Sequence, residues 1–90
     1  MKRLVLCEVV WKASRRRGAR PSEGFWAVYY SGYLQSWFNT KPEAVSYARR
    51  IAKKRSSEKR GVTLRIKKKN GRVQEERTYP RALDPRRSPG

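Results

Sequence analysis

The stretch FWAVYYSGYLQSWFNTKPEA, residues 25–44, changes its pattern of apolar residues at Thr40. Its first part is rich in aromatic side chains on both sides of Ser31-Gly32. This is typical of two strands joined by a tight turn, because aromatic residues suit a pleated surface and glycine supplies the positive φ of the turn. From Thr40 onward, apolar residues recur at helical spacing. The stretch therefore predicts a β-hairpin followed directly by a helix.

Two registers are open for this hairpin. A two-residue loop places Trp26 opposite Trp37, whereas a three-residue loop with a glycine bulge places Val28 opposite Leu34. We favour the second register, because it brings Trp26, Val28, Leu34 and Phe38 together on one face of the sheet.

The helix is expected to begin at a capping box. In TKPE, the Thr40 hydroxyl can accept a hydrogen bond from the Glu43 amide, and the Glu43 side chain can reach back to Thr40. An apolar stripe about 100° wide follows, which predicts an amphipathic helix that ends near Ser56 or Ser57. The stripe consists of Ala44, Val45, Ala48, Ile51 and Ala52, with Tyr47 at its edge.

Three further strands are predicted, one before this central unit and two after it. Residues 4–11 are an apolar run rich in Val and Leu, and residues 62–67 alternate between apolar and polar side chains. Asn70-Gly71 predicts a type I′ turn, after which residues 72–79 return as the last strand. The predicted fold class is α+β, in the order β-β-β-α-β-β. It has a three-stranded antiparallel meander, one amphipathic helix packed on one sheet face and a C-terminal β-hairpin.

The Asn-Gly turn also predicts a register for the C-terminal hairpin. A two-residue loop pairs Arg65 with Glu76 and Lys67 with Gln74, which is favourable cross-strand chemistry. It sets Ile66 against Glu75, which suits a strand at the edge of a sheet. The chain is thus expected to be a single domain at residues 1–79 with a basic loop at 12–24, followed by a Pro/Arg-rich tail at 80–90.

Four segments resemble a known family in the same order. They are Trp26-Ala27-Val28, FNTKPEA at residues 38–44, ARRIAKK at 48–54 and NGRVQEERTY at 70–79. Together they resemble the small bacterial domain of unknown function 2188 over residues 24–79. The resemblance implies a three-stranded meander, one helix and a C-terminal hairpin, and it implies no activity. The chain departs from the family's usual pattern in its basic loop, its YYSGY turn and its surplus of Arg and Lys.

The balance of charged residues narrows the classes of function that the chain could have. The 90 residues include 24 Lys and Arg against 7 Asp and Glu, a formal net charge of +17. Such a balance favours a polyanionic partner, most often nucleic acid. With no histidine and one cysteine, the chain has no ligand set for structural zinc and cannot form an internal disulfide. No acid–base pair stands out either, so we expect no enzymatic activity, no cofactor, no membrane association and a cytoplasmic location.

The cations group in three segments, a loop, a helix and a hairpin tip. We expect these segments to converge on RNA or DNA and to contact mainly phosphates, so that the chain could be an accessory part of a ribonucleoprotein or nucleoid assembly. A solvated surface that only aids solubility is the competing interpretation. The predicted nucleic-acid-binding residues are Arg15, Arg16, Arg17, Arg20, Arg49, Arg50, Lys53, Lys54, Lys67, Lys68, Lys69 and Arg72.

A second predicted site is an aromatic face of Phe25, Tyr29, Tyr33 and Trp37, on the side of the sheet away from the helix. One helix covers only one side of a sheet, so these side chains are left to meet something else. They could stack on bases, form a homodimer, or dock with the basic surface onto an acidic region of a large complex such as a polymerase or nuclease. Alternatively, the basic loop and the tail could fold over this face.

Overall fold

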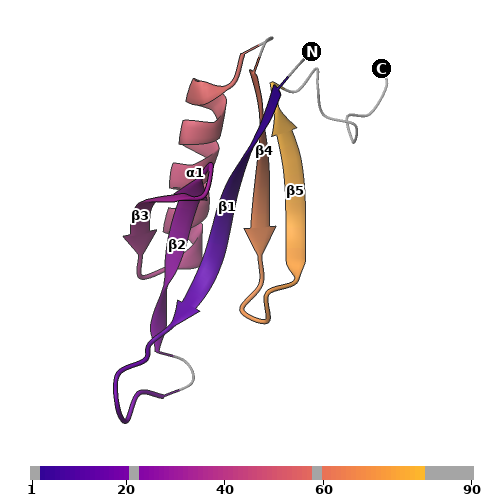
Figure 1. The fold of residues 1–90 in the computed structure, drawn as a ribbon. Coiled ribbons are helices and arrows are strands. Elements are labelled where there is room, and N and C mark those ends of the chain that lie inside the picture. Colours follow the sequence, from indigo (N-terminus) through magenta and orange to yellow (C-terminus); the bar gives the residue numbers. More distant parts are fainter. Residues whose placement is uncertain (1–2, 21–22, 58–59, 81–90) are drawn as a thin grey trace.

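The computed structural model describes residues 3–20, 23–57 and 60–80. They form five strands and one helix in the predicted order (Figure 1). The elements are β1 (Arg3–Ala13), β2 (Gly24–Tyr30), β3 (Tyr33–Phe38), α1 (Lys41–Arg55), β4 (Arg60–Lys67) and β5 (Val73–Tyr79). The α+β prediction is confirmed. The part of the predicted tail at residues 81–90 lies outside the described residues.

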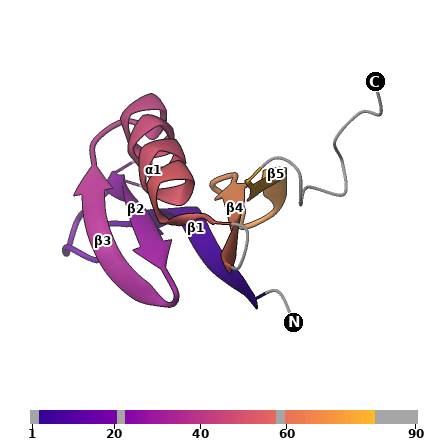
Figure 2. The ribbon, with the colours of Figure 1, turned by 90° about the horizontal axis from the view of Figure 1, so that it is seen from above.

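The strands form one mixed sheet in the order β3-β2-β1-β4-β5. β1, β2 and β3 are the predicted antiparallel meander, and β4 and β5 are the predicted hairpin. After α1 the chain returns so that β4 pairs parallel with β1, which puts β1 at the centre and leaves β5 at an edge, as expected. Figure 2 shows α1 on one side of the sheet, and no other described element covers the opposite side, which we call the open face.

The core lies between α1 and the sheet. Its largest fully buried side chains are Leu64, Val9, Val28, Val62 and Cys7. Three alanines of α1 face them with no exposed surface, so the helix backbone can approach the strands closely. These are Ala44, Ala48 and Ala52 of the predicted apolar stripe. The alternation of apolar and polar residues along the strands therefore determines which face of the sheet is buried against α1.

The β2–β3 hairpin differs from the favoured register. Ser31 and Gly32 have φ of 52° and 84°, both positive as in a two-residue hairpin turn, and Tyr29 pairs with Leu34. A bulge at the following residue then shifts the pairing, so that Val28 faces Ser36. The three-residue loop with Val28 opposite Leu34 is therefore wrong. The other register is wrong as well, because the bulge brings Phe38, not Trp37, opposite Trp26.

The β4–β5 hairpin also departs from its predicted turn. Among the described residues near it, only Gly71 has a positive φ, 87°, whereas a type I′ turn needs a second one at Asn70. The Gly71 amide donates to the Lys68 carbonyl at 2.9 Å, and the Lys68 amide donates to the Arg72 carbonyl at 2.8 Å. The turn is thus a three-residue loop closed by a glycine, one residue longer than predicted.

A second irregularity in β5 compensates for this longer loop. Lys67 pairs with Val73 and not with Gln74, which is the extra residue, and beyond it Ile66 faces Glu75. Arg65 pairs with Glu76 as predicted. The prediction for Lys67 is therefore wrong, and the rest of the register is confirmed.

The two ends of α1 lie near their predicted positions. Thr40 is the N-cap residue and Ser56 is the C-cap residue. The capping box is not formed, however. The Thr40 hydroxyl donates directly to a Glu43 carboxylate oxygen at 2.6 Å, so neither side chain bonds a backbone amide at the helix start.

Candidate functional site

The parallel pairing of β1 with β4 places two basic segments at one edge of the sheet. The loop after β1 (residues 14–23) and the loop after β4 (residues 68–72) leave their strands in the same direction, and Figure 1 shows both at the same end of the molecule. We call this region the cationic end. It comprises Lys12, Arg15, Arg16, Arg17, Arg20, Lys41, Lys67, Lys68, Lys69 and Arg72.

The loop after β1 is shorter than the predicted 12–24. Lys12 still belongs to β1, and Gly24 already begins β2, because it pairs with Ala13. Within the loop, the Ala19 amide donates to the Arg16 carbonyl at 2.9 Å. The Arg16 guanidinium lies 2.6 Å from the Glu23 carboxylate, which ties the two sides of the loop together. Arg16 is thus the one cation of this loop that meets a carboxylate among the described residues.

Three other arginines of the loop face solvent. Arg15, Arg17 and Arg20 are exposed, and none of them contacts a carboxylate in the described part of the chain. Their guanidinium charges therefore face the solvent, where only dissolved ions screen them.

Two tryptophans hold lysines at the base of the cationic end. Trp11 and Trp26 contact each other, with ring centroids 5.2 Å apart. The Lys69 ammonium lies 4.4 Å from the centroid of Trp11, and the Lys41 ammonium lies 5.0 Å from the centroid of Trp26. Such cation–π contacts restrict long side chains without neutralising their charge. They connect the β4–β5 turn and the start of α1 to the sheet.

The lysines at this point are close enough to affect one another. Partial burial, and then the positive charge of Lys68, lower the pKa of the Lys41 ammonium. Lys41 also donates a hydrogen bond to the Gln74 side chain. An anion that bound here would relieve the repulsion between the two ammonium groups.

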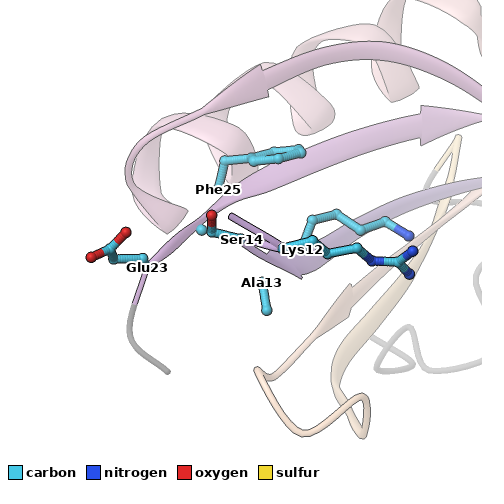
Figure 3. Close-up of a pocket in the computed structure, with 7 residues that line it drawn as sticks. Lys12, Ala13, Ser14, Glu23 and Phe25 are labelled. Carbon is cyan, nitrogen blue, oxygen red and sulfur yellow. The ribbon is translucent and has the colours of Figure 1, made fainter. Parts of the chain in front are cut away.

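A hollow of about 720 Å³ lies where the loop meets β1 and β2 (Figure 3). In Figure 3 the Lys12 side chain extends away from the Glu23 carboxylate, and the Phe25 ring lies to one side of the hollow. The hollow thus combines cations with an aromatic ring at the edge of the open face. Its lining residues are Lys12, Ala13, Ser14, Arg15, Glu23, Gly24 and Phe25.

The helix cations lie elsewhere. Lys53 sits over the ring of Tyr79, 6.0 Å from its centroid, and Arg55 sits 4.7 Å from the ring centroid of Tyr30. Tyr79 pairs with Val62 near the start of β4, at the opposite end of the strand from the turn at residues 68–72. The structure therefore brings together the predicted loop and hairpin cations, and it places the last turn of α1 toward the other end.

Two more of the predicted cations are neutralised within the fold. Arg49 contacts the Glu75 carboxylate at 3.4 Å, and Lys67 contacts the Glu8 carboxylate at 2.9 Å. Arg77 also donates to Glu75 at 2.8 Å. This hydrogen bond is the main reason that the pKa of Glu75 is lowered, and Arg49 adds to it.

The open face carries three of the four predicted aromatic residues. Phe25 and Trp37 contact each other with ring centroids 5.8 Å apart, and the Lys12 ammonium lies 5.4 Å from the ring centroid of Tyr29. Tyr33 is different, because it pairs with the core residue Tyr30 and so projects to the helix side. The described part of the basic loop projects beyond the end of the sheet (Figure 1).

Three residues of this region are absent from the predicted sites. Lys12 and Lys41 belong to the cationic end, and Leu34 takes the place of Tyr33 on the open face, where it is 53% exposed. Lys12 faces Phe25 across β1 and β2, a pairing that the register of the first hairpin would have revealed. Lys41 could be found only from the position of α1 over the sheet.

Other chemistry has little support. Burial raises the pKa of the Cys7 thiol to about 12, so the nucleophilic thiolate is absent at neutral pH. Among the described residues, no group of three or more Cys, Asp or Glu side chains could hold a metal ion. The helix that the structure describes is too short and too polar to cross a membrane.

Comparison with known proteins identifies the family. No curated protein and no solved structure matches the chain. The family described as "Uncharacterized protein conserved in bacteria (DUF2188)" matches residues 16–79, which are 64 of the 90 residues. The match begins inside the basic loop and runs to the end of β5, so it includes every described element except β1. The resemblance seen in the sequence is confirmed, and the chain belongs to the DUF2188 family.

Proposed function

We propose that this protein binds nucleic acid, mainly through phosphate contacts at the cationic end. One observation carries the proposal. Because β1 and β4 are parallel neighbours, the two loops that follow them present their cations from the same edge of the sheet. Two adjacent cation-rich loops can follow successive phosphates along a backbone, which scattered surface lysines cannot do.

The distribution of acidic residues supports the same conclusion. Of the 7 acidic residues in the chain, Glu8 and Glu23 contact cations of the cationic end, Lys67 and Arg16 respectively. Glu75 and Glu76 contact cations of α1, β4 and β5. Arg15, Arg17, Arg20, Lys68 and Arg72 have no carboxylate contact among the described residues. A surface that served only solubility would gain nothing from concentrating such charges on two adjacent loops.

The test compares three variants that each lose three positive charges. One carries Ala at Arg15, Arg17 and Arg20, and it keeps the contact between Arg16 and Glu23 that closes the loop. The second carries Ala at Lys68, Lys69 and Arg72. The control carries Ala at Arg50, Lys53 and Lys54 of α1, so that its net charge equals that of the other two.

Affinity for a labelled 20-nucleotide strand is measured by fluorescence anisotropy at several salt concentrations. About six phosphate contacts in the unmodified protein would lower affinity roughly a thousandfold between about 50 and 200 mM salt. We expect each variant of the cationic end to lose affinity and to reduce the steepness of the salt dependence by roughly two to three contacts. The α1 control should change far less.

Two outcomes would contradict the proposal. Equal losses in all three variants would show that net charge acts without a site. Little affinity of the unmodified protein at low salt, both for this strand and for a duplex of the same length, would remove nucleic acid as the ligand. It would favour the alternative in which the basic surface docks on an acidic protein.

A further inference from the structure

We infer that the ligand is a single-stranded nucleic acid whose unpaired bases stack on Phe25 and Trp37 of the open face while its phosphates lie at the cationic end. This inference rests on the proposed function and narrows its class of ligand. It follows from the position of the aromatic rings, their exposure and the charges that border them.

The two rings are neighbours tilted by 60° to each other, and together they form an aromatic platform that reaches the cationic end. Phe25 pairs with Lys12 in the ladder between β1 and β2, and it also lines the hollow beside Arg15. Trp37 contacts Phe25 at 5.8 Å between ring centroids. A base stacked on either ring would therefore have its phosphate within the part of the surface where Lys12 and the loop arginines gather.

The exposure of the rings points to a partner. Trp37 is 58% exposed and Phe25 is 36% exposed, although both are large apolar side chains beside a well-packed sheet. Ala27 pairs with Trp37 and lies two residues after Phe25 in β2, on the same face of the sheet. It has no exposed surface, so a small side chain underlies the larger rings. In a duplex the faces of the bases are covered by stacking, and only unpaired bases can lie on such a platform.

The surrounding charges favour a polyanion over a second copy of this chain. Lys12 lies over Tyr29 at the border of the aromatic rings. On the other half of the open face, the carboxylates of Glu8 and Glu76 contact Lys67 at 2.9 Å and Arg65 at 3.0 Å, so they do not repel an anion as free carboxylates would. A homodimer through the same face would instead bring two chains of net charge +17 together.

The experiment measures binding of two kinds of ligand, single strands and a duplex, to matched variants of the full chain. The single strands are a labelled 15-nucleotide oligothymidylate and a labelled 15-nucleotide oligouridylate, and the duplex is a labelled 15-base-pair one, all at the same salt concentration. The variants are Trp37→Ala, Trp37→Tyr, which keeps a stacking ring, and Tyr33→Ala. The last removes an aromatic ring that is 75% exposed on the helix side, so it is a control for the loss of a surface aromatic residue.

We expect Trp37→Ala to weaken binding of the single strands roughly tenfold and binding of the duplex less than about twofold, since stacking on an aromatic ring contributes only when a base is free. Trp37→Tyr should retain most of the affinity for single strands. Tyr33→Ala should match the unmodified protein with both ligands. Comparison of the oligothymidylate with the oligouridylate then distinguishes DNA from RNA as the better ligand.

Two results would overturn the inference and leave the proposed function intact. One is strong binding to both ligands with no selective effect of Trp37→Ala. Another is an unmodified dimer that Trp37→Ala converts to a monomer, as seen by sedimentation, with binding of single strands unchanged. By contrast, failure of the unmodified protein to bind either ligand would overturn the proposed function itself.

Discussion

At the scale of single residues, Gly24 illustrates how a close approach constrains the sequence. A Cβ on this residue would lie 2.3 Å from the Lys12 carbonyl oxygen and 2.6 Å from Cζ2 of Trp11. Both neighbours belong to the paired strand that leads into the basic loop, so they cannot move without disturbing the base of the cationic end. Glycine at this position therefore serves packing and not a special φ.

We predict that Gly24→Ala destabilises the fold by about 1–3 kcal/mol, the usual cost of overpacking a closely packed site. Urea denaturation followed by tryptophan fluorescence measures this change. Gly18→Asn is the control, because a side chain at Gly18 meets nothing within 4 Å and Asn tolerates the positive φ of 82° there. Equal stability of Gly24→Ala and the unmodified protein would show that β1 and β2 separate freely at this point.

Tyr30 carries a polar atom that the core does not satisfy. Its hydroxyl is buried and has no hydrogen-bond partner among the described residues, while its ring packs in the core beneath the Arg55 guanidinium. An unsatisfied buried hydroxyl costs free energy, and a phenyl ring of the same shape avoids that cost.

Tyr30→Phe is therefore expected to stabilise the protein by about 1 kcal/mol, as measured by the midpoint of urea unfolding. Tyr33→Phe, at the exposed partner of Tyr30 in β3, should leave the midpoint unchanged. A loss of stability in Tyr30→Phe would mean that the hydroxyl does have a partner in the folded protein.

At the scale of elements, the sequence predicts which segments form strands and helix far better than it predicts their registers. The periodicity of apolar residues decides which segments form strands and helix, and it identified the buried stripe of α1 and the strand pattern of β4. The registers depend on bulges at Gln35 and Gln74, and neither residue carries a local signal that it will be the extra one. Each bulge shifts the pairing of the residues beyond it by one position, which puts Trp37 on the open face and restores Ile66 opposite Glu75. The turns themselves, and not the bulges, place Leu34 on the open face and Val73 opposite Lys67.

The candidate site is likewise predicted in part from the sequence, in its residues but not in their arrangement. Its cations are evident in the composition, and the loop that carries Arg15 and Arg17 could be predicted from its lack of periodicity. Their position at the same edge of the sheet as Lys68 depends on the parallel pairing of β1 with β4, a contact between segments more than 50 residues apart. Local patterns do not encode such a pairing, so the convergence of two segments, and the separation of the third, required the structure.

At the scale of the whole molecule, charge opposes the fold. The net charge of +17 is spread over 90 residues, and the described residues use only Glu8, Glu23, Glu75 and Glu76 in contacts with cations. These contacts are largely solvent-exposed, so each contributes little, about 0–1 kcal/mol. The repulsion among the remaining cations acts over the whole surface and is strongest at low ionic strength.

Added salt should consequently stabilise the protein, because it screens the repulsion among many cations more than it weakens a few surface ion pairs. We expect the melting temperature, followed by circular dichroism, to rise by roughly 4–8 °C between about 20 and 500 mM NaCl, which corresponds to about 1 kcal/mol for a domain of this size. The triple variant with Ala at Arg15, Arg17 and Arg20 should melt higher than the unmodified protein at 20 mM NaCl and show a smaller rise, because it has removed part of the repulsion at its densest point. A melting temperature that falls with salt in both proteins would mean that the contacts of Glu8, Glu23, Glu75 and Glu76 outweigh the repulsion, and that the cationic end is not under electrostatic strain.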